Sequence, residues 1–344
     1  MYSPLHGTGN IPARRVMKEI GFENVYVVPE QELPNGDFPT VSYPNPEAAE
    51  AFELGLKLAK EKNADLVLAT DPDADRLGIY AKDSKTGEYM PFTGNMSGML
   101  IAEYILRERT ATNRMPVDPV MVSTIVTTNM AAAIAADYNV ELREVLTGFK
   151  YIGEQIKWME QAGKGHYVFG LEESYGCLAG TYARDKDAVV ATLLICEMAA
   201  YYKKQGMTLY DGLMALYEKY GYYREGVKSL TMKGLDGVEK IQKIMASFRA
   251  ETPAVFAGVA VEWAKDYKTQ VFKNLTTGEE MASPLPVSDV VYYTLADGSW
   301  ICVRPSGTEP KLKFYIGVKG DSLADAQAKI DALEADIDAK VAAV

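Results

Sequence analysis

In the first two thirds of the chain, short apolar runs alternate with segments whose apolar residues recur every three to four positions. The runs indicate buried strands, and the three-to-four spacing indicates helices. The predicted strands are 25–28, 65–70, 77–80, 120–126, 141–146 and 167–171, and the predicted helices are 11–20, 47–62, 95–109, 128–137, 151–162, 187–205 and 208–220. This alternation occurs in two tandem sets and is typical of α/β domains with mixed, mostly parallel sheets.

The last third of the chain has a different order of elements. Strands are predicted over 258–263, 290–295, 300–303 and 313–317, between helices over 236–250 and 322–344. Strands grouped between two helices favour an α+β domain. We therefore expect three domains, 1–112, 113–225 and 226–344, with a linker near 221–235.

Composition narrows the classes of partner. The net charge of −11 argues against nucleic acid or an anionic membrane as the main partner, and a small anionic ligand would need local basic contacts. The three cysteines, Cys177, Cys196 and Cys302, lie far apart and predict a reducing, cytoplasmic setting. Only two histidines are present, His6 and His166, which excludes a multi-histidine metal site. No signal-peptide pattern and no apolar stretch of membrane-spanning length is visible.

The segment TDPDADR, residues 70–76, places three aspartates directly after an apolar run. Asp71, Asp73 and Asp75 repel one another unless a cation lies among them, and hard oxygen ligands suit Mg²⁺ better than zinc. An EF-hand would need glycine at the sixth loop position and glutamate at the twelfth, where this chain has Arg76 and Lys82. The sequence therefore predicts an Mg²⁺ site, with a solvated acidic turn as the alternative.

The segment RPSGTEP, residues 304–310, follows another predicted strand. Arg304 offers a bidentate fork, Ser306 and Thr308 offer hydroxyls, and Gly307 lets backbone amides approach an anion closely. Together they predict a phosphate-binding loop. An ordinary Pro-Ser-Gly turn between strands is the alternative.

The segment GLEESYG, residues 170–176, also ends a predicted strand. Glu172, Glu173 and Ser174 can hydrogen-bond sugar hydroxyls. Adjacent residues of a strand point to opposite faces, so the two glutamates would not flank one glycosidic bond as a hydrolytic pair. We expect a sugar-binding loop, with a helix-capping cluster as the alternative.

Two further loops carry lysines. Lys150 ends TGFK, residues 147–150, where it can reach a phosphate or act as an acid or base, and Lys186 lies between two acids in RDKDA, residues 184–188. A charged capping turn is the alternative for the second loop. All five loops lie where a strand has ended or a helix begins, which is where open α/β sheets bind ligands. We expect the metal, sugar and phosphate sites of the three domains to enclose one substrate.

Taken together, the motifs PLHGTG, TDPDADR, TGFK, GLEESYG, RDKDA and RPSGTEP resemble those of the α-D-phosphohexomutases and occur in the same order. The resemblance covers essentially the whole chain, from the second to the fourth domain of that family. The two glutamates before Ser174 make the chain most similar to the phosphoglucomutase branch.

The resemblance implies an isomerase that moves phosphate between C1 and C6 of glucose through a phosphoserine, with Mg²⁺ and with glucose 1,6-bisphosphate as intermediate and activator. The implied roles are Mg²⁺ binding by Asp71, Asp73 and Asp75; catalysis by Arg76, Lys150 and Lys186; sugar and other substrate contacts by Thr147, Gly148, Glu172 and Ser174; and phosphate binding by Arg304, Ser306, Gly307 and Thr308.

Two departures from the family pattern matter. Some members have a histidine two residues after the sugar-binding serine, where this chain has Gly176, so we expect Lys150 or Lys186 to transfer the proton. The family's first domain, whose serine lies in a Thr-Ala-Ser-His-Asn-Pro-like loop, is expected to be a missing partner, and the chain alone is expected to be inactive. Phosphomannomutase or phosphopentomutase activity, a split enzyme and a non-catalytic phosphosugar-binding protein are the alternatives.

Overall fold

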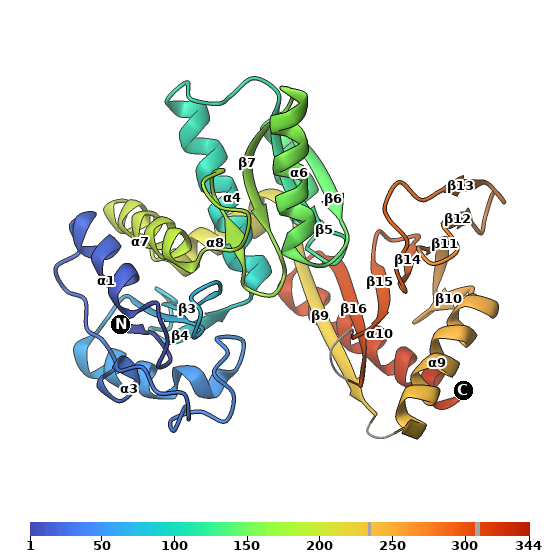
Figure 1. Ribbon diagram of the computed structural model, residues 1–344, viewed down its shortest axis with the longest axis horizontal. Helices are drawn as coiled ribbons and strands as arrows, with labels where there is room; N and C mark the ends of the chain where they lie inside the picture. Colours follow the sequence, from blue (N-terminus) through green and yellow to red (C-terminus); the bar gives the residue numbers. More distant parts are fainter. Residues whose placement is uncertain (233–234, 307–309) are drawn as a thin grey trace. The chain divides into compact units, whose positions relative to one another are not determined.

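The computed structural model describes residues 1–232, 235–306 and 310–344. It divides into two compact units, Met1–Tyr220 and Gly221–Val344. The first unit contains both predicted α/β regions and the second contains the α+β region (Figure 1). The predicted fold class is therefore confirmed.

The first half of unit Met1–Tyr220 is built on a four-stranded sheet of order β1-β2-β3-β4. Its elements are β1 (Tyr2–Ser3), α1 (Asn10–Glu19), α2 (Pro29–Glu32), the 3-10 helix η1 (Ala49–Phe52), α3 (Glu53–Lys62), β2 (Leu66–Thr70), β3 (Leu77–Lys82) and β4 (Tyr89–Phe92). The apolar run 25–28, predicted as a strand, forms only a single bridge, between Val27 and Tyr2.

This sheet has fewer parallel pairs than predicted. β1 pairs parallel with β2, but the β2–β3 and β3–β4 pairs are antiparallel. Only residues 71–76 separate β2 from β3, and a parallel pair would need a crossover of a dozen residues or more. The segment is therefore a hairpin, and its loop carries the three aspartates.

The second half of this unit contains a four-stranded sheet of order β6-β5-β7-β8. Its elements are α4 (Gly94–Ala111), β5 (Pro119–Thr124), α5 (Met130–Asp137), β6 (Glu141–Val145), α6 (Phe149–Ala162), β7 (His166–Leu171), β8 (Cys177–Leu178), α7 (Ala188–Lys204) and α8 (Leu209–Tyr220). β5 pairs parallel with both β6 and β7. The residues of β5 are almost all buried, as expected of a strand that is covered on both faces.

Helices join the two sheets into one unit. α4 packs against β3 and β4 of the first sheet and against α5, α7 and α8 of the second half, and α7 packs against α1 (Figure 1). The carboxyl ends of strands from both sheets can therefore contribute to one site.

Unit Gly221–Val344 contains an antiparallel sheet of order β13-β12-β11-β14-β15-β16-β9, with β10 paired to β11. Its elements are β9 (Tyr222–Thr231), α9 (Leu235–Ala250), β10 (Val255–Phe256), β11 (Val259–Asp266), β12 (Val271–Asn274), β13 (Glu280–Ala282), β14 (Val291–Leu295), β15 (Trp300–Pro305), β16 (Lys311–Gly320) and α10 (Leu323–Ala342). Phe314 of β16 and Ile337 of α10 are fully buried in its core.

One predicted segment has a different structure. Residues 221–235 were expected to be a linker, but β9 occupies most of them and pairs with β16 over ten residues. The strand runs through the predicted domain boundary at 225, and the boundaries at 112 and 225 remain predictions.

The structure also describes the surroundings of the cysteines and the length and polarity of the helices. Cys177, Cys196 and Cys302 are all buried. Among the described residues, the helices are too short or too polar to cross a bilayer.

Candidate active site

The β2–β3 hairpin brings the three aspartates together. Asp71 directly follows the buried strand β2, and its Oδ1 accepts hydrogen bonds of 3.0 Å from the amides of both Asp75 and Arg76. Ala74 has a φ of 59°, a left-handed conformation that tightens the loop between Asp71 and Asp75. One carboxylate oxygen from each of Asp71, Asp73 and Asp75 lies within 4.8 Å of the others. The loop thus presents a cluster of oxygen ligands.

The electrostatics of this cluster favour a cation. Asp71 is only 7% exposed, and burial raises its pKa to about 7, with the charges of Asp75 and Asp73 acting in the same direction against the hydrogen bond from Arg76. The buried Oδ1 of Asp75 has no hydrogen-bond partner among the described residues. A hard divalent ion would supply the missing contact and relieve the repulsion, so the donor set fits Mg²⁺.

Arg76 lies against the same carboxylates. Its Nε is 3.6 Å from both Asp71 Oδ2 and Asp75 Oδ1, and its Nη1 is 3.1 Å from Glu47 Oε1. Glu47 was not among the predicted site residues, because it lies 29 positions before Arg76 and reaches it only through the tertiary fold.

Lys186 approaches the cluster from the RDKDA loop. Its Nζ is 2.9 Å from Asp75 Oδ2 and 2.9 Å from Asp185 Oδ1, and its side chain is only 12% exposed. Burial lowers the pKa of Lys186, but the bonds to the two aspartates outweigh burial and the net shift is upward. The side chain therefore carries a positive charge beside the aspartates.

The GLEESYG loop and the TGFK loop are joined by one hydrogen bond. Glu172 is buried just after β7, and its Oε1 accepts a 2.9 Å hydrogen bond from the amide of Gly148. Burial raises the pKa of Glu172, while the nearby positive charge of Lys186 lowers it. Thr147 and Ser174 are half-buried beside these residues in the chain. This hydrogen bond holds the two loops side by side.

Lys150 differs from Lys186 in its surroundings. It is exposed in the first turn of α6, with its Nζ 4.9 Å from the centre of the Tyr151 ring. The structure therefore places Lys186, rather than Lys150, in contact with the aspartates.

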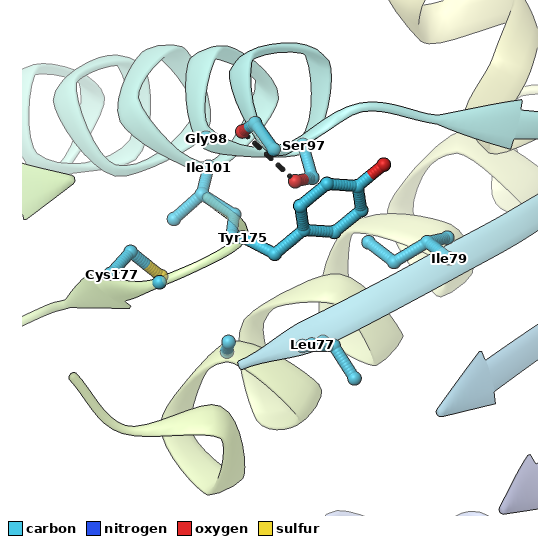
Figure 2. Close-up of a pocket in the computed structure, with 10 residues that line it drawn as sticks. Leu77, Ile79, Ser97, Gly98, Ile101, Tyr175 and Cys177 are labelled. Carbon is cyan, nitrogen blue, oxygen red and sulfur yellow. Dashed lines mark hydrogen bonds between the residues drawn. The ribbon is translucent and has the colours of Figure 1, made fainter. Parts of the chain in front are cut away.

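Tyr175 of the GLEESYG loop packs against the elements beneath that loop. Figure 2 shows its ring between helix α4, at Ser97, and strand β3, at Ile79, in a small pocket that Ile101 and Cys177 also line. The pocket is largely apolar, so it belongs to the packing beneath the loop rather than to a phosphosugar site.

Backbone hydrogen bonds fasten the loops to one another. The Leu77 amide donates to Tyr175 O at 3.1 Å, the Ala188 amide donates to Ala74 O at 3.0 Å, and the Thr8 amide donates to Pro72 O at 2.7 Å. The aspartate hairpin is therefore held by the PLHGTG, GLEESYG and RDKDA segments, and all four lie in one compact unit.

The two histidines lie outside this cluster of side chains. His6 contacts Thr40 Oγ1 at 2.8 Å through Nε2 and Leu33 O at 3.2 Å through Nδ1. These contacts are consistent with a structural role for the loop histidine.

The predicted phosphate loop lies in the other unit. Arg304 is half-buried on β15, opposite Lys313 of β16. The amide of Ser306 donates a 2.8 Å hydrogen bond to Lys311 O. Gly307 and Thr308 lie outside the described residues. The enclosure of one substrate by loops of both units remains a prediction.

Comparisons with known proteins were made on sequence and on structure. Residues 1–86, 93–220 and 232–335 match the families described as phosphoglucomutase/phosphomannomutase alpha/beta/alpha domain II, alpha/beta/alpha domain III and C-terminal domain. The chain is 35% identical over 333 residues to the phosphoglucomutase of Staphylococcus aureus strain MRSA252, an alignment that covers 97% of this chain and 59% of that protein. The chain thus spans just under three fifths of that relative.

Solved structures show the same fold at lower sequence identity. The open form of pp63/parafusin, a phosphoglucomutase from Paramecium, has a TM-score of 0.67 at 18% identity and covers 99% of this chain and 56% of its own. The N-acetylphosphoglucosamine mutase of Aspergillus fumigatus, in complex with glucose 1,6-bisphosphate, has a TM-score of 0.53 at 13% identity over 99% of this chain and 60% of its own. A second structure of that enzyme, with GlcNAc-6P and magnesium, has a TM-score of 0.51 at 12% identity over 95% and 59%.

The family matches follow the chain in order, cover most of its length and include each of the loops described above. With the likeness to the staphylococcal enzyme, they show that this chain belongs to the phosphoglucomutase/phosphomannomutase family.

Proposed function

We propose that this chain carries the metal-, sugar- and phosphate-binding loops of a phosphoglucomutase, which interconverts glucose 1-phosphate and glucose 6-phosphate. The observation that carries the proposal is the cluster in which Asp71, Asp73 and Asp75 lie beside Arg76 and Lys186. Fixed positive groups beside a divalent-ion site are what phosphoryl transfer requires, because the transferring group is strongly negative.

In this proposal the three aspartates hold Mg²⁺, which neutralises charge on the transferring phosphoryl group when bound. Arg76 and Lys186 add two fixed charges at the same place. Glu172 and Ser174 hold the sugar hydroxyls, with Thr147, Gly148 and Lys150 on the neighbouring loop. The preorganised bond between Glu172 and Gly148 supports this role, because it fixes the carboxylate before a ligand arrives.

The phosphate that is not being transferred would be held by Arg304, Ser306, Gly307 and Thr308. The reaction exchanges the two ends of the sugar, so this loop must recognise phosphate charge rather than sugar detail. Glucose 1,6-bisphosphate would serve as intermediate and activator. The 35% identity to an enzyme named phosphoglucomutase supports glucose over mannose or pentose phosphates.

The nucleophile of the proposed reaction is a phosphoserine. The 344 residues contain no Thr-Ala-Ser-His-Asn-Pro-like loop, so the serine would come from a serine-bearing domain outside this sequence. We therefore expect this polypeptide alone to bind the bisphosphate without converting substrate. Its three cysteines, which are buried and lie far apart in the sequence, support a cytoplasmic setting.

Two measurements on residues 1–344 test the proposal. Calorimetric titration with glucose 1,6-bisphosphate should show Mg²⁺-dependent binding, which Arg304→Ala weakens about 10- to 100-fold because a charge-assisted phosphate contact is lost. Arg224→Ala, on β9 of the same unit, is the matched control and should bind as the unchanged chain does. A coupled assay with glucose 1-phosphate should show no turnover. Turnover at enzymatic rates, or bisphosphate binding unaffected by Arg304→Ala, would contradict the proposal.

A further inference from the structure

Lys186 occupies an unusual position for a side chain next to a divalent-metal cluster. Its ammonium lies 2.9 Å from Asp75 Oδ2, while Arg76 Nε lies 3.6 Å from Asp75 Oδ1. Both oxygens of one proposed metal ligand thus face cationic side chains. A metal ion bound by Asp75 has to share or replace these contacts.

The chain makes room for Lys186 at a specific residue. Gly176 ends the GLEESYG motif, and an ideal Cβ added there would lie 2.0 Å from Lys186 Cδ and 2.7 Å from its Cγ. Backbone conformation does not explain why residue 176 is glycine, because the φ of Gly176 is not positive. The space above Gly176 is filled instead by the aliphatic part of Lys186, which passes over it to reach Asp75.

Two other contacts keep Lys186 near the cluster when its bond to Asp75 is broken. Its ammonium also bonds Asp185, the preceding residue, and lies 5.6 Å from the centre of the Phe149 ring. The side chain can therefore leave Asp75 without leaving the site.

We propose that Lys186 is a built-in counter-cation of the aspartate cluster: it neutralises Asp75 in the metal-free protein, and Mg²⁺ displaces it from that carboxylate. Gly176 is the positioning residue that makes this contact possible. The inference rests on the proposed metal site and adds a competitor to it. The Lys186 ammonium and the metal ion compete for Asp75. The free energy of the Lys186–Asp75 ion pair is therefore subtracted from the free energy of metal binding.

Metal titration provides the first test. Binding of Mg²⁺ alone, measured by calorimetry, should be about two- to tenfold tighter in Lys186→Met, since a partly buried ion pair no longer opposes it. Gly176→Ala retains the lysine but displaces its stem, and it should tighten binding in the same direction. Lys186→Arg retains the charge and should stay close to the unchanged chain. Lys157→Met, at an exposed position of α6, controls for removing a lysine charge of the same unit and should have little effect.

Chemical labelling provides a second test that does not depend on a substitution. Amine acetylation followed by mass spectrometry should modify Lys186 faster with saturating Mg²⁺ than without it, while the exposed Lys150 is modified equally in both. Thermal unfolding shows whether Gly176→Ala is folded, and Lys186→Met carries the test if it is not. Weaker or unchanged Mg²⁺ binding in Lys186→Met, or labelling of Lys186 that ignores Mg²⁺, would overturn the proposal. If neither the unchanged chain nor any variant bound Mg²⁺, the proposed metal site would be overturned as well. That result therefore distinguishes failure of the metal site from failure of the Lys186 proposal.

Discussion

At the scale of single residues, Glu173 is the acid of the GLEESYG segment to which the family resemblance assigns no role. It directly follows Glu172 in the chain and is half-buried, and its Oε2 accepts a 3.2 Å hydrogen bond from Thr124 Oγ1. Burial raises the pKa of Glu173 from 4.5 to about 7, and the charge of Glu172 adds to this, against the hydrogen bonds from its own amide and from Thr124. The folded protein therefore favours the protonated form.

The sign of the pH dependence follows from that shift. An acid with a raised pKa binds more protons in the folded state, so its contribution to stability is full below pH 4.5 and is lost as the pH rises through about 7. We expect Glu173→Gln, which can still accept the bond from Thr124, to reduce the loss of unfolding free energy between pH 5 and 8 by about 1–3 kcal/mol. Urea unfolding at several pH values measures this. Glu61→Gln, an exposed site, should keep the original profile; an unchanged profile in Glu173→Gln would contradict the assignment.

The sequence could predict that side chains lie close together only where those residues are near one another in the chain. Asp71, Asp73 and Asp75 alternate within five positions, so one hairpin was enough to bring them together. The contacts of Arg76 with Glu47, of Lys186 with Asp75 and of Glu172 with Gly148 join segments 24 to 111 residues apart in the numbering. No local pattern predicts such pairs, because they depend on the tertiary fold, and the contact of Lys186 with Asp75 depends on how the two sheets pack.

At the scale of elements, helix α6 lies between two glycines with different functions. Gly148 precedes it with a φ of 123° and Gly163 ends it with a φ of 59°. Gly148 donates to Glu172 from a conformation that residues with a side chain avoid, whereas Gly163 ends the helix in the left-handed region, with open space around it.

Alanine at these two positions should therefore have different effects. Gly148→Ala should cost about 1–3 kcal/mol of stability and weaken bisphosphate binding at least severalfold, because the strain moves the amide away from Glu172. Gly163→Ala should cost about 1 kcal/mol and leave binding unchanged. Chemical unfolding and calorimetry measure both. Equal effects of the two substitutions on binding would show that the Glu172–Gly148 bond does not support the site.

Elements that the sequence did not predict share a physical cause. β9 has half-buried and exposed residues only, which alternate in its second half, and it is stabilised by pairing with β16, about ninety positions later. β12 and β13 are short, with exposed residues, and also depend on neighbouring strands. Helices and central strands, whose apolar residues are sufficient by themselves, were predicted to within a few positions.

At the scale of the whole molecule, each unit has its own core. Phe314 belongs to a cluster of buried residues from Gly221–Val344, and Ile152 belongs to one from Met1–Tyr220. Units with separate cores can unfold separately.

We expect calorimetric unfolding to show this separation. Phe314→Ala leaves a cavity at a fully buried position, so it should destabilise one transition by about 3–5 kcal/mol and leave the other at its original temperature. Ile152→Val, in the other core, should shift the second transition by a smaller amount. A single transition that moves as a whole in both variants would show that the units unfold together.

The packing of Trp300 has a spectroscopic consequence. This tryptophan is 2% exposed, stacks on Tyr292 with 5.5 Å between ring centres and fills the space above Gly317, whereas Trp158 on α6 is 47% exposed. Ultraviolet emission from the two indoles should differ in wavelength, and iodide should quench Trp158 much more strongly than Trp300. Trp158 lies in unit Met1–Tyr220, and Trp300 lies with the third tryptophan, Trp263, in unit Gly221–Val344, so the natural fluorophores of the chain can report separately on the two units without an added dye.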